Sequence, residues 1–181
     1  MRWVFWITGS LAAIAALIAI TGALLPRDHV STRAASYHQP PEAIWRAITN
    51  YEEFPKWRTG VTRVERLPDI NGHLAWMERS GSGGNSGGIP YEMVEAVPSQ
   101  NGAPGKLVTR IADPKLPFGG TWTYEVTLAG DGTELRITER GSVYNPFFRF
   151  ISTLIIGQTK TINDYLTALG SKFGENVTTR N

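Results

Sequence analysis

From Val61 onward, apolar and polar residues alternate with a period of two along six separate stretches of the chain. In the clearest stretch, Trp122, Tyr124 and Val126 fall on one face, and the polar residues Thr123 and Glu125 fall on the other. This pattern is typical of antiparallel strands with one buried and one solvated face. Turn signals such as the sequence AGDGT separate the stretches. The pattern predicts six strands, within residues 61–67, 73–79, 89–97, 106–112, 120–129 and 133–143.

Before these strands, the pattern predicts one more strand and two short helices. Residues 29–39 alternate and read as the first strand, which Pro40 and Pro41 end. A proline fits the first turn of a helix, and the apolar residues within 43–48 recur at helical spacing. We therefore expect a helix over residues 41–50 and a second, shorter helix over residues 51–57.

The chain ends with a helical pattern about 28 residues long. Asn145 is a suitable cap, Pro146 suits the first turn, and Gly174 suits the end. One apolar stripe runs along it at helical spacing, made of Phe147, Ile151, Leu154, Ile155, Ile162, Leu166, Leu169 and Phe173. At about 1.5 Å per residue, such a helix would be roughly 42 Å long and could lie across a whole sheet, with a bend at Gly157.

The N-terminus carries an apolar run, from Trp3 to Leu25, without any charged residue. Its 23 residues could cross a hydrocarbon core about 30 Å thick. The alternative is a cleaved signal peptide, but the run is longer than the usual apolar region and a small-residue cleavage site fits poorly. We expect a single-pass anchor over residues 1–26 and one soluble domain over residues 27–181. Positive residues on both sides of the run leave the orientation in the membrane open.

Composition changes this picture mainly by exclusion. The 181 residues are enough for one domain with a full core, and 18 Lys and Arg against 16 Asp and Glu do not form a basic footprint for nucleic acid. The chain has no cysteine, and its three histidines lack metal-ligand spacing. The sequence therefore predicts no disulfide, no metal site and no cofactor, and it leaves the oligomeric state open.

One strand, two short helices, six antiparallel strands and a long helix form a specific order. A curved antiparallel sheet that grips a long helix leaves a pocket between them, because the strands twist. In this order, and in four stretches, the chain resembles the START-like helix-grip superfamily (SRPBCC), which includes polyketide cyclase/dehydrase-like proteins. The stretches are PPEAIWRAITNYEEFPKW at 40–57, PFGGTWTYEV at 117–126, GTELRITERG at 132–141 and NPFFRF at 145–150.

The resemblance covers about residues 30 to 170 and implies an α+β helix-grip fold, with a curved sheet of about seven strands wrapped around the C-terminal helix. It also implies a hydrophobic ligand cavity with an entrance near the short helices. It implies no catalytic motif, because members bind lipids, hormones or polyketides and only some catalyse ring closure.

Aromatic residues on the strands are the main candidates for lining such a cavity, although they could equally fill a core. The candidates on strands are Trp76, Tyr91, Met93, Trp122 and Tyr124. Phe54 and Trp57 bracket Pro55 in the second short helix. They could close the mouth of the core or form the lid of a ligand entrance near the membrane.

Glu139 is the candidate acid or base. The alternation of its strand places it on the inner face with Leu135 and Ile137, where burial would raise its pKa. The alternative is a structural ion pair. The pentapeptide GNSGG at 84–88 matches a nucleophile elbow formally, but it is followed by a strand rather than a helix, so we interpret it as a loop.

Three functions remain open. The first is a membrane-tethered domain, held by residues 3–25, that binds a hydrophobic small molecule or lipid. The second is a polyketide cyclase/dehydrase-like enzyme in which Glu139 and Tyr124 assist proton transfer. The third is an interaction module whose aromatic residues fill its own core.

Overall fold

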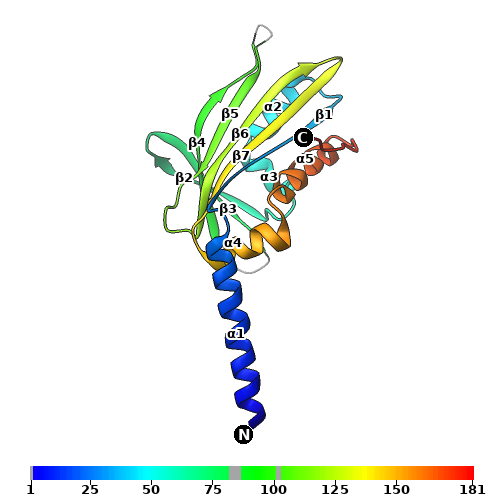
Figure 1. The fold of residues 1–181 in the computed structure, drawn as a ribbon. Coiled ribbons are helices and arrows are strands. Elements are labelled where there is room, and N and C mark those ends of the chain that lie inside the picture. The colour runs from blue at the N-terminus through cyan, green and yellow to red at the C-terminus, as the bar shows by residue number, and fades with distance from the viewer. Residues whose placement is uncertain (1, 82–86, 101–102) are drawn as a thin grey trace.

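The computed structural model describes residues 2–81, 87–100 and 103–181. A long N-terminal helix projects from an α+β domain whose elements follow the predicted order (Figure 1). The helices are α1 (Arg2–Leu24), α2 (Pro41–Thr49), the 3-10 turn η1 (Tyr51–Glu53), α3 (Phe54–Trp57), α4 (Pro146–Phe150), the π-helical η2 (Ile151–Ile156) and α5 (Lys160–Lys172). The strands are β1 (Asp28–Tyr37), β2 (Arg63–Ile70), β3 (His73–Arg79), β4 (Gly88–Val97), β5 (Gly105–Ile111), β6 (Phe118–Ala129) and β7 (Gly132–Val143).

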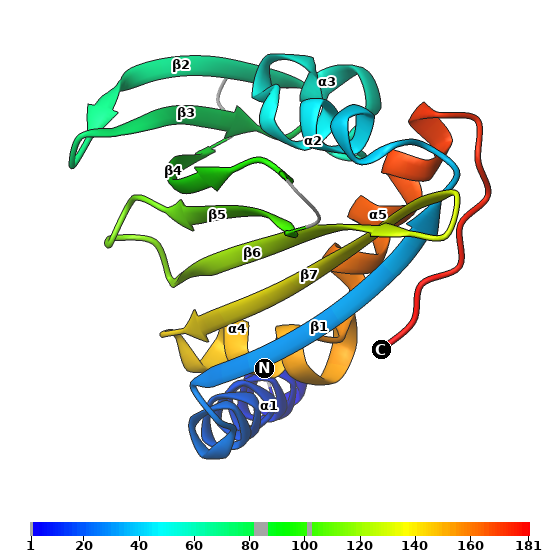
Figure 2. The same cartoon turned by 90° about the horizontal axis from the view of Figure 1, so that it is seen from above.

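The seven strands form one antiparallel sheet in the order β1-β7-β6-β5-β4-β3-β2. Consecutive strands from β2 to β7 are neighbours, and β1 closes the order by pairing with the last strand, β7. The sheet curves around α5, while α2 and α3 cover its other end (Figure 2). The predicted helix-grip fold is therefore confirmed.

The main core lies between the concave face of the sheet and helices α2 and α5. Helix α5 contributes Ile162, Leu166 and Leu169, all fully buried, against Leu135 and Ile137 of β7. A smaller core around Phe54 and Trp76 lies beneath η1 and α3. The two cores are in contact through the partly buried side chains of Trp57 and Met93.

The C-terminal helix is not continuous, which corrects the prediction of one helix from Pro146 onward. Gly157 adopts φ +83°, a left-handed conformation that ends the helical path, and its N–H bonds to the carbonyl of Ser152 in a π-type turn. Of the parts of this C-terminal region, α5 is the one that packs against the concave face of the sheet. The apolar stripe is split accordingly, because Ile162, Leu166 and Leu169 are buried whereas Phe147, Leu154 and Ile155 are exposed.

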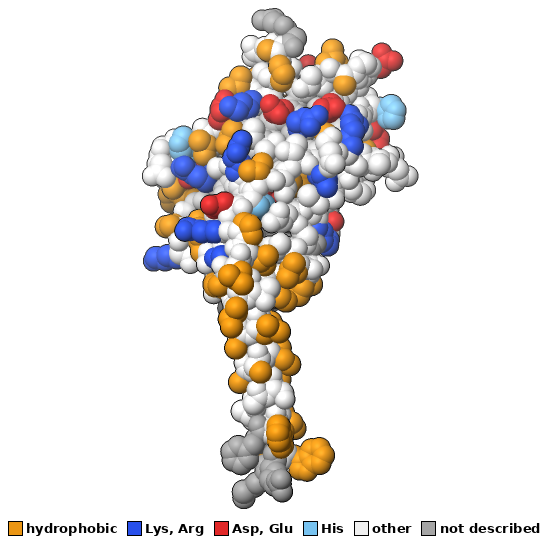
Figure 3. All heavy atoms as spheres, in the orientation of Figure 1, with side chains coloured by type: hydrophobic (Ala, Val, Ile, Leu, Met, Phe, Trp, Pro, Cys, Tyr) orange, Lys and Arg blue, Asp and Glu red, His pale blue; other side chains and the backbone are white. Residues whose placement is uncertain are grey.

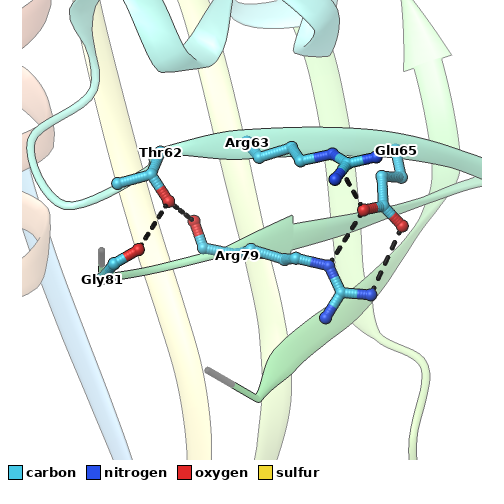
Figure 4. Close-up of polar contacts among 5 residues, drawn as sticks. All are labelled: Thr62, Arg63, Glu65, Arg79 and Gly81. Carbon is cyan, nitrogen blue, oxygen red and sulfur yellow. Dashed lines mark hydrogen bonds and ion pairs between the residues drawn. The ribbon is translucent and has the colours of Figure 1, made fainter. Parts of the chain in front are cut away.

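The exposed edge of the sheet carries ion pairs that face solvent (Figure 4). Glu65 on β2 accepts from Arg63 and Arg79, each at 3.0 Å, while the Thr62 hydroxyl donates to the carbonyls of Arg79 and Gly81. These contacts hold β2 against β3. Because these ion pairs are exposed to solvent, they can be compared with an ion pair in the interior, between Arg58 and Glu78.

Helix α1 is long and apolar enough, by length and composition, to cross a membrane between Trp6 and Leu24, and very little of it is buried. A signal sequence at the same place would pass the same test. Three residues of the GNSGG pentapeptide, 84–86, lie outside the described residues, so its interpretation as a loop stays a prediction.

Candidate functional site

A cavity of about 280 Å³ lies between the concave face of the sheet and helices α3 and α5. Its volume is close to the lower limit of about 300 to 1,000 Å³ that is usual for small-molecule sites. Residues from α2, α3, all strands from β3 to β7 and α5 reach it. The apolar side chains that line it are Ile48, Phe54, Trp76, Ile89, Tyr91, Ile111, Phe118, Trp122 and Tyr124.

One wall of the cavity is built from stacked aromatic rings. Trp76 on β3 lies between Tyr51 and Tyr91, with ring centroids 5.0 Å and 5.8 Å apart and nearly parallel planes. Trp76 and Tyr91 are Cα partners in adjacent strands, so the sheet register itself sets this stack. The stack provides a rigid, flat apolar surface.

The wall nearer α5 is a second aromatic group. Trp122 and Tyr124 of β6 each pack against Tyr165 of α5, at centroid distances of 5.8 Å and 5.6 Å. Tyr165 also contacts the edge of Trp57 at 5.2 Å. These tilted and edge-to-face contacts fix the rings without filling the space between the sheet and the helix.

A buried ion pair stands in this aromatic setting. The Arg58 guanidinium donates to Oε1 of Glu78 at 2.7 Å, and the indole N–H of Trp76 donates to the same oxygen at 2.9 Å. The Arg58 and Glu78 side chains are only 16% and 7% exposed. The guanidinium also lies over the rings of Phe54 and Tyr165, at 4.8 Å and 4.9 Å from their centroids. This packing leaves Arg58 satisfied by one carboxylate and two aromatic faces.

The tyrosines of the cavity remain neutral hydrogen-bonding groups. Burial raises the pKa of Tyr124 to about 12, with Arg58 opposing the rise and Glu78 adding to it. Burial, reinforced by Glu78, also raises the pKa of Tyr91 well above its ordinary value. Both hydroxyls therefore stay protonated at neutral pH and can donate to an oxygen of a bound molecule.

Glu139 is the carboxyl group at the other side of the cavity, on β7 beside Trp122 of β6. Burial raises its pKa, and the neighbouring Trp122 indole and His29 imidazole partly oppose that rise. Its Oε1 lies 3.8 Å from Nε2 of His29 on β1. A carboxyl group with a raised pKa that faces a cavity is a candidate proton donor or acceptor.

Six of the eight predicted ligand-binding residues line this cavity: Phe54, Trp76, Tyr91, Trp122, Tyr124 and Glu139. Trp57 and Met93 do not, because they pack between the two cores instead. Whether any of the six contacts a ligand stays a prediction.

Sequence reasoning missed Arg58, and the pattern along residues 73–79 does not indicate which way Glu78 faces. Arg58 follows α3 directly, where no period indicates the direction of a side chain. Glu78 belongs to a strand whose alternation is irregular, with buried residues at Ala75, Trp76 and Glu78. Their pairing over 20 residues of sequence could be read only from the folded chain.

Comparison with solved structures shows the same fold in proteins of low sequence identity. An aromatase/cyclase from a Streptomyces species matches with a TM-score of 0.61 and 11% identity, over 80% of this chain and 93% of that chain. A norcoclaurine synthase from Thalictrum flavum matches with a TM-score of 0.58 and 12% identity, over 82% and 95%. A START superfamily protein from Mycobacterium smegmatis matches with a TM-score of 0.55 and 16% identity, over 80% and 94%.

Curated protein sequences provide no match. A family model described as polyketide cyclase / dehydrase and lipid transport, however, matches residues 29–172. That range includes strands β2 to β7 and helix α5 in full, and all of β1 except Asp28. The predicted START-like resemblance is therefore confirmed, and the chain belongs to the polyketide cyclase / dehydrase and lipid transport family.

Proposed function

We propose that this protein is a membrane-tethered binding protein for a hydrophobic small molecule or lipid, which it holds in the cavity between the sheet and α5. The observation that carries the proposal is the cavity itself. It is walled by aromatic rings, and it presents buried polar groups at Arg58 and Glu78. An interaction module with a filled core has less support, because space of about 280 Å³ remains among the same aromatic residues.

The cavity wall favours a ligand with a compact apolar body and a polar group. The stacked rings of Trp76 and Tyr91 offer a face for a flat ring or an alkyl chain. The hydroxyls of Tyr91 and Tyr124, with their raised pKa values, offer hydrogen-bond donors to a carbonyl or hydroxyl oxygen. A net charge on the ligand is less favoured, because Arg58 is already neutralised by Glu78.

The membrane tether is supported by how the end of α1 joins the domain. The Arg149 guanidinium of α4 donates to the carbonyl of Leu25 at 3.1 Å, just beyond the last turn of α1. Gly22, which is buried, lies against the backbone of Pro146. A segment that is packed and hydrogen-bonded in this way is part of the folded protein, as a retained anchor over residues 1–26 would be.

We expect a substitution that fills the cavity to abolish ligand retention. Ile89→Trp adds bulk to a lining residue of β4, and Val97→Trp adds the same bulk at the exposed end of the same strand. The full chain is purified in lipid nanodiscs, and the molecules that remain bound are extracted with organic solvent and quantified by mass spectrometry. Because the indole takes the space that a ligand would fill, occupancy should fall about tenfold or more in Ile89→Trp only, which corresponds to about 1.4 kcal/mol or more of lost binding free energy.

Equal occupancy in both variants, or no extracted molecule in the unsubstituted protein together with no uptake of an apolar fluorescent probe, would contradict the proposed binding function. A fold that is intact by circular dichroism in both variants is the control.

A second candidate function is catalysis of a cyclase/dehydrase type. It is favoured by Glu139, a carboxyl group with a raised pKa at the wall of the cavity that Tyr91 and Tyr124 also line. One solved structure with the same fold is an aromatase/cyclase, which makes this chemistry compatible with the fold. The test is the loss of turnover in Glu139→Gln.

A further inference from the structure

An exposed apolar surface on α4 and η2 has no role in the cavity. It is made of Phe147, Phe148, Leu154 and Ile155, which are between 44% and 67% exposed, and we refer to these four residues as the α4–η2 face. Four large apolar side chains on one short segment are unusual on a solvated surface. Exposure of these side chains to water is unfavourable, so we expect another apolar surface to cover them.

The α4–η2 face lies at the base of the domain, where α1 leaves it (Figure 1). A Cβ atom on Gly22 would lie 1.9 Å from the Pro146 carbonyl oxygen, so α1 and α4 are in direct backbone contact. In the space-filling view, hydrophobic side chains continue from α1 onto the base of the domain (Figure 3). The apolar surface of α1 and that of α4 and η2 are thus continuous.

The same segment carries almost no charge that would oppose its transfer from water into an apolar environment. From Pro146 to Thr159 the only charged residue is Arg149. Its guanidinium donates to three carbonyl oxygens, those of Leu25, Val143 and Tyr144, each at 3.1 Å. Arg149 therefore joins α4 to α1 and β7 and has most of its donors satisfied within the protein.

Residues typical of a lipid headgroup region lie next to this surface. Arg27 follows α1, and its guanidinium lies 4.5 Å from the ring centroid of Tyr144, which is itself 40% exposed. Tyrosine and arginine are common at the boundary between hydrocarbon and water. If α1 spans a bilayer, Arg27 and Tyr144 stand at its surface and the α4–η2 face stands beside them.

We propose that the α4–η2 face inserts into the lipid bilayer beside α1 and places one end of the cavity at the membrane surface. The inference rests on the proposed membrane tether. The occupant of the surface is the bilayer rather than a second protein, because the surface is continuous with the helix that would cross that bilayer.

The cavity reaches this end of the domain. Phe118, Gly119 and Gly120, at the start of β6, line it. Phe118 is the Cα partner of Val143, and the Tyr144 N–H donates to the carbonyl of Pro117 at 2.8 Å. The lining residue Thr161 lies just after the break at Gly157. In the proposed arrangement this end of the cavity therefore lies near the membrane surface.

The absence of cysteine from the chain makes the test direct, since single cysteines can be introduced and spin-labelled. Leu154→Cys and Ile155→Cys place labels on the α4–η2 face. Leu128→Cys places one near the opposite end of β6, on an equally exposed residue, and Leu17→Cys places one on α1. The full chain is reconstituted in vesicles of phosphatidylcholine and phosphatidylglycerol, and label accessibility to oxygen and to a water-soluble nickel chelate is measured by electron paramagnetic resonance.

We expect the labels at Leu154 and Ile155 to favour oxygen over nickel, at a depth of about 5–10 Å below the headgroups, as surface-bound amphipathic helices do. The label at Leu128 should favour nickel. If the label at Leu17 lies in the bilayer but the labels at Leu154 and Ile155 are exposed to water, this inference is overturned and the tether still holds. A water-exposed label at Leu17 would overturn the tether itself. Dipolar broadening between labels at Leu154 would show a second copy on this surface and would also overturn the inference.

Discussion

Arg58 and Glu78 bring opposite charges into an aromatic enclosure where neither charge would be stable alone. Each charged group also contacts a third residue. The Trp76 indole N–H donates to Glu78, and the Arg58 guanidinium lies over the rings of Phe54 and Tyr165. A buried pair of this kind contributes little net stability compared with apolar residues of the same volume. Both side chains line the cavity, and for this reason we propose that they recognise the polar group of a ligand.

Removing one member of the buried pair should destabilise the fold strongly. In Glu78→Ala, the Arg58 guanidinium and the Trp76 indole N–H lose their shared acceptor within the domain. Breaking such a pair typically lowers the free energy of unfolding by about 3–5 kcal/mol. Urea unfolding of the full chain in detergent micelles, followed by tryptophan fluorescence, measures this change.

Glu65→Ala is the matched control, because Glu65 also contacts two donor side chains, those of Arg63 and Arg79, but does so at the solvated edge of the sheet. Exposed ion pairs contribute little, so this variant should unfold close to the unsubstituted protein. Similar losses in the two variants would mean that burial of the Arg58–Glu78 pair has no energetic consequence.

Glu139 would support catalysis only in its deprotonated form if it acts as a general base. Burial raises its pKa, so the fraction deprotonated, and with it the turnover, should rise as the pH increases through that raised pKa. With a short linear poly-β-ketone as the probe, Glu139→Gln should lower the cyclisation rate by about 10² to 10⁴-fold and remove this pH dependence. An unchanged rate and pH profile would exclude Glu139 from proton transfer.

At the level of elements, the C-terminal helical region divides into two parts with different environments. Helix α5 packs its apolar residues into the core, whereas α4 and η2 leave theirs exposed at the base of the domain. The break at Gly157 separates the parts and redirects the chain. One stripe in the sequence therefore faces the core along α5 and solvent or lipid along α4 and η2.

The contact between α1 and α4 should depend on the absence of a side chain at Gly22. In Gly22→Leu, the new Cβ would meet backbone atoms of Pro146, at 1.9 Å from the oxygen and 2.7 Å from the carbon, so α4 must move away. We expect amide hydrogen exchange in α4 to accelerate about tenfold or more, which corresponds to about 1.4 kcal/mol of lost local stability. Mass spectrometry of exchange in the full chain checks this.

Gly9→Leu provides the control on the same helix, because a Cβ atom there meets nothing within 4 Å. Exchange in α4 that is equal in the two variants would show that α1 does not hold α4 in place.

At the level of the whole molecule, the sheet order explains why the proposed anchor and the exposed apolar segment lie together. The first strand pairs antiparallel with the last, so the start of β1 lies beside the end of β7. Helix α1 precedes β1, and α4 follows β7. The Val143 N–H donates to the Arg27 carbonyl at 2.9 Å and fixes the junction. The topology alone thus brings residues about 120 positions apart to one end of the domain, as the Arg149 to Leu25 bond illustrates.

The order of the elements could be predicted from the printed residues, because period-two and helical patterns are local and each strand or helix carries its own. The alternation also predicted that Trp122, Tyr124 and Glu139 face inward, since alternation along a strand fixes the face of a side chain. The apolar run of α1 and the family resemblance were likewise readable from the printed residues.

Features that depend on neighbours far apart in the chain required the folded structure. It paired Arg58 with Glu78, placed Trp57 and Met93 between the two cores, and set the volume that remains as a cavity. It also ended the long helix at Gly157 and turned half of an apolar stripe outward against α1. A periodic pattern indicates which residues share a face of a strand or helix. Packing against segments that are distant in the sequence decides what that face contacts.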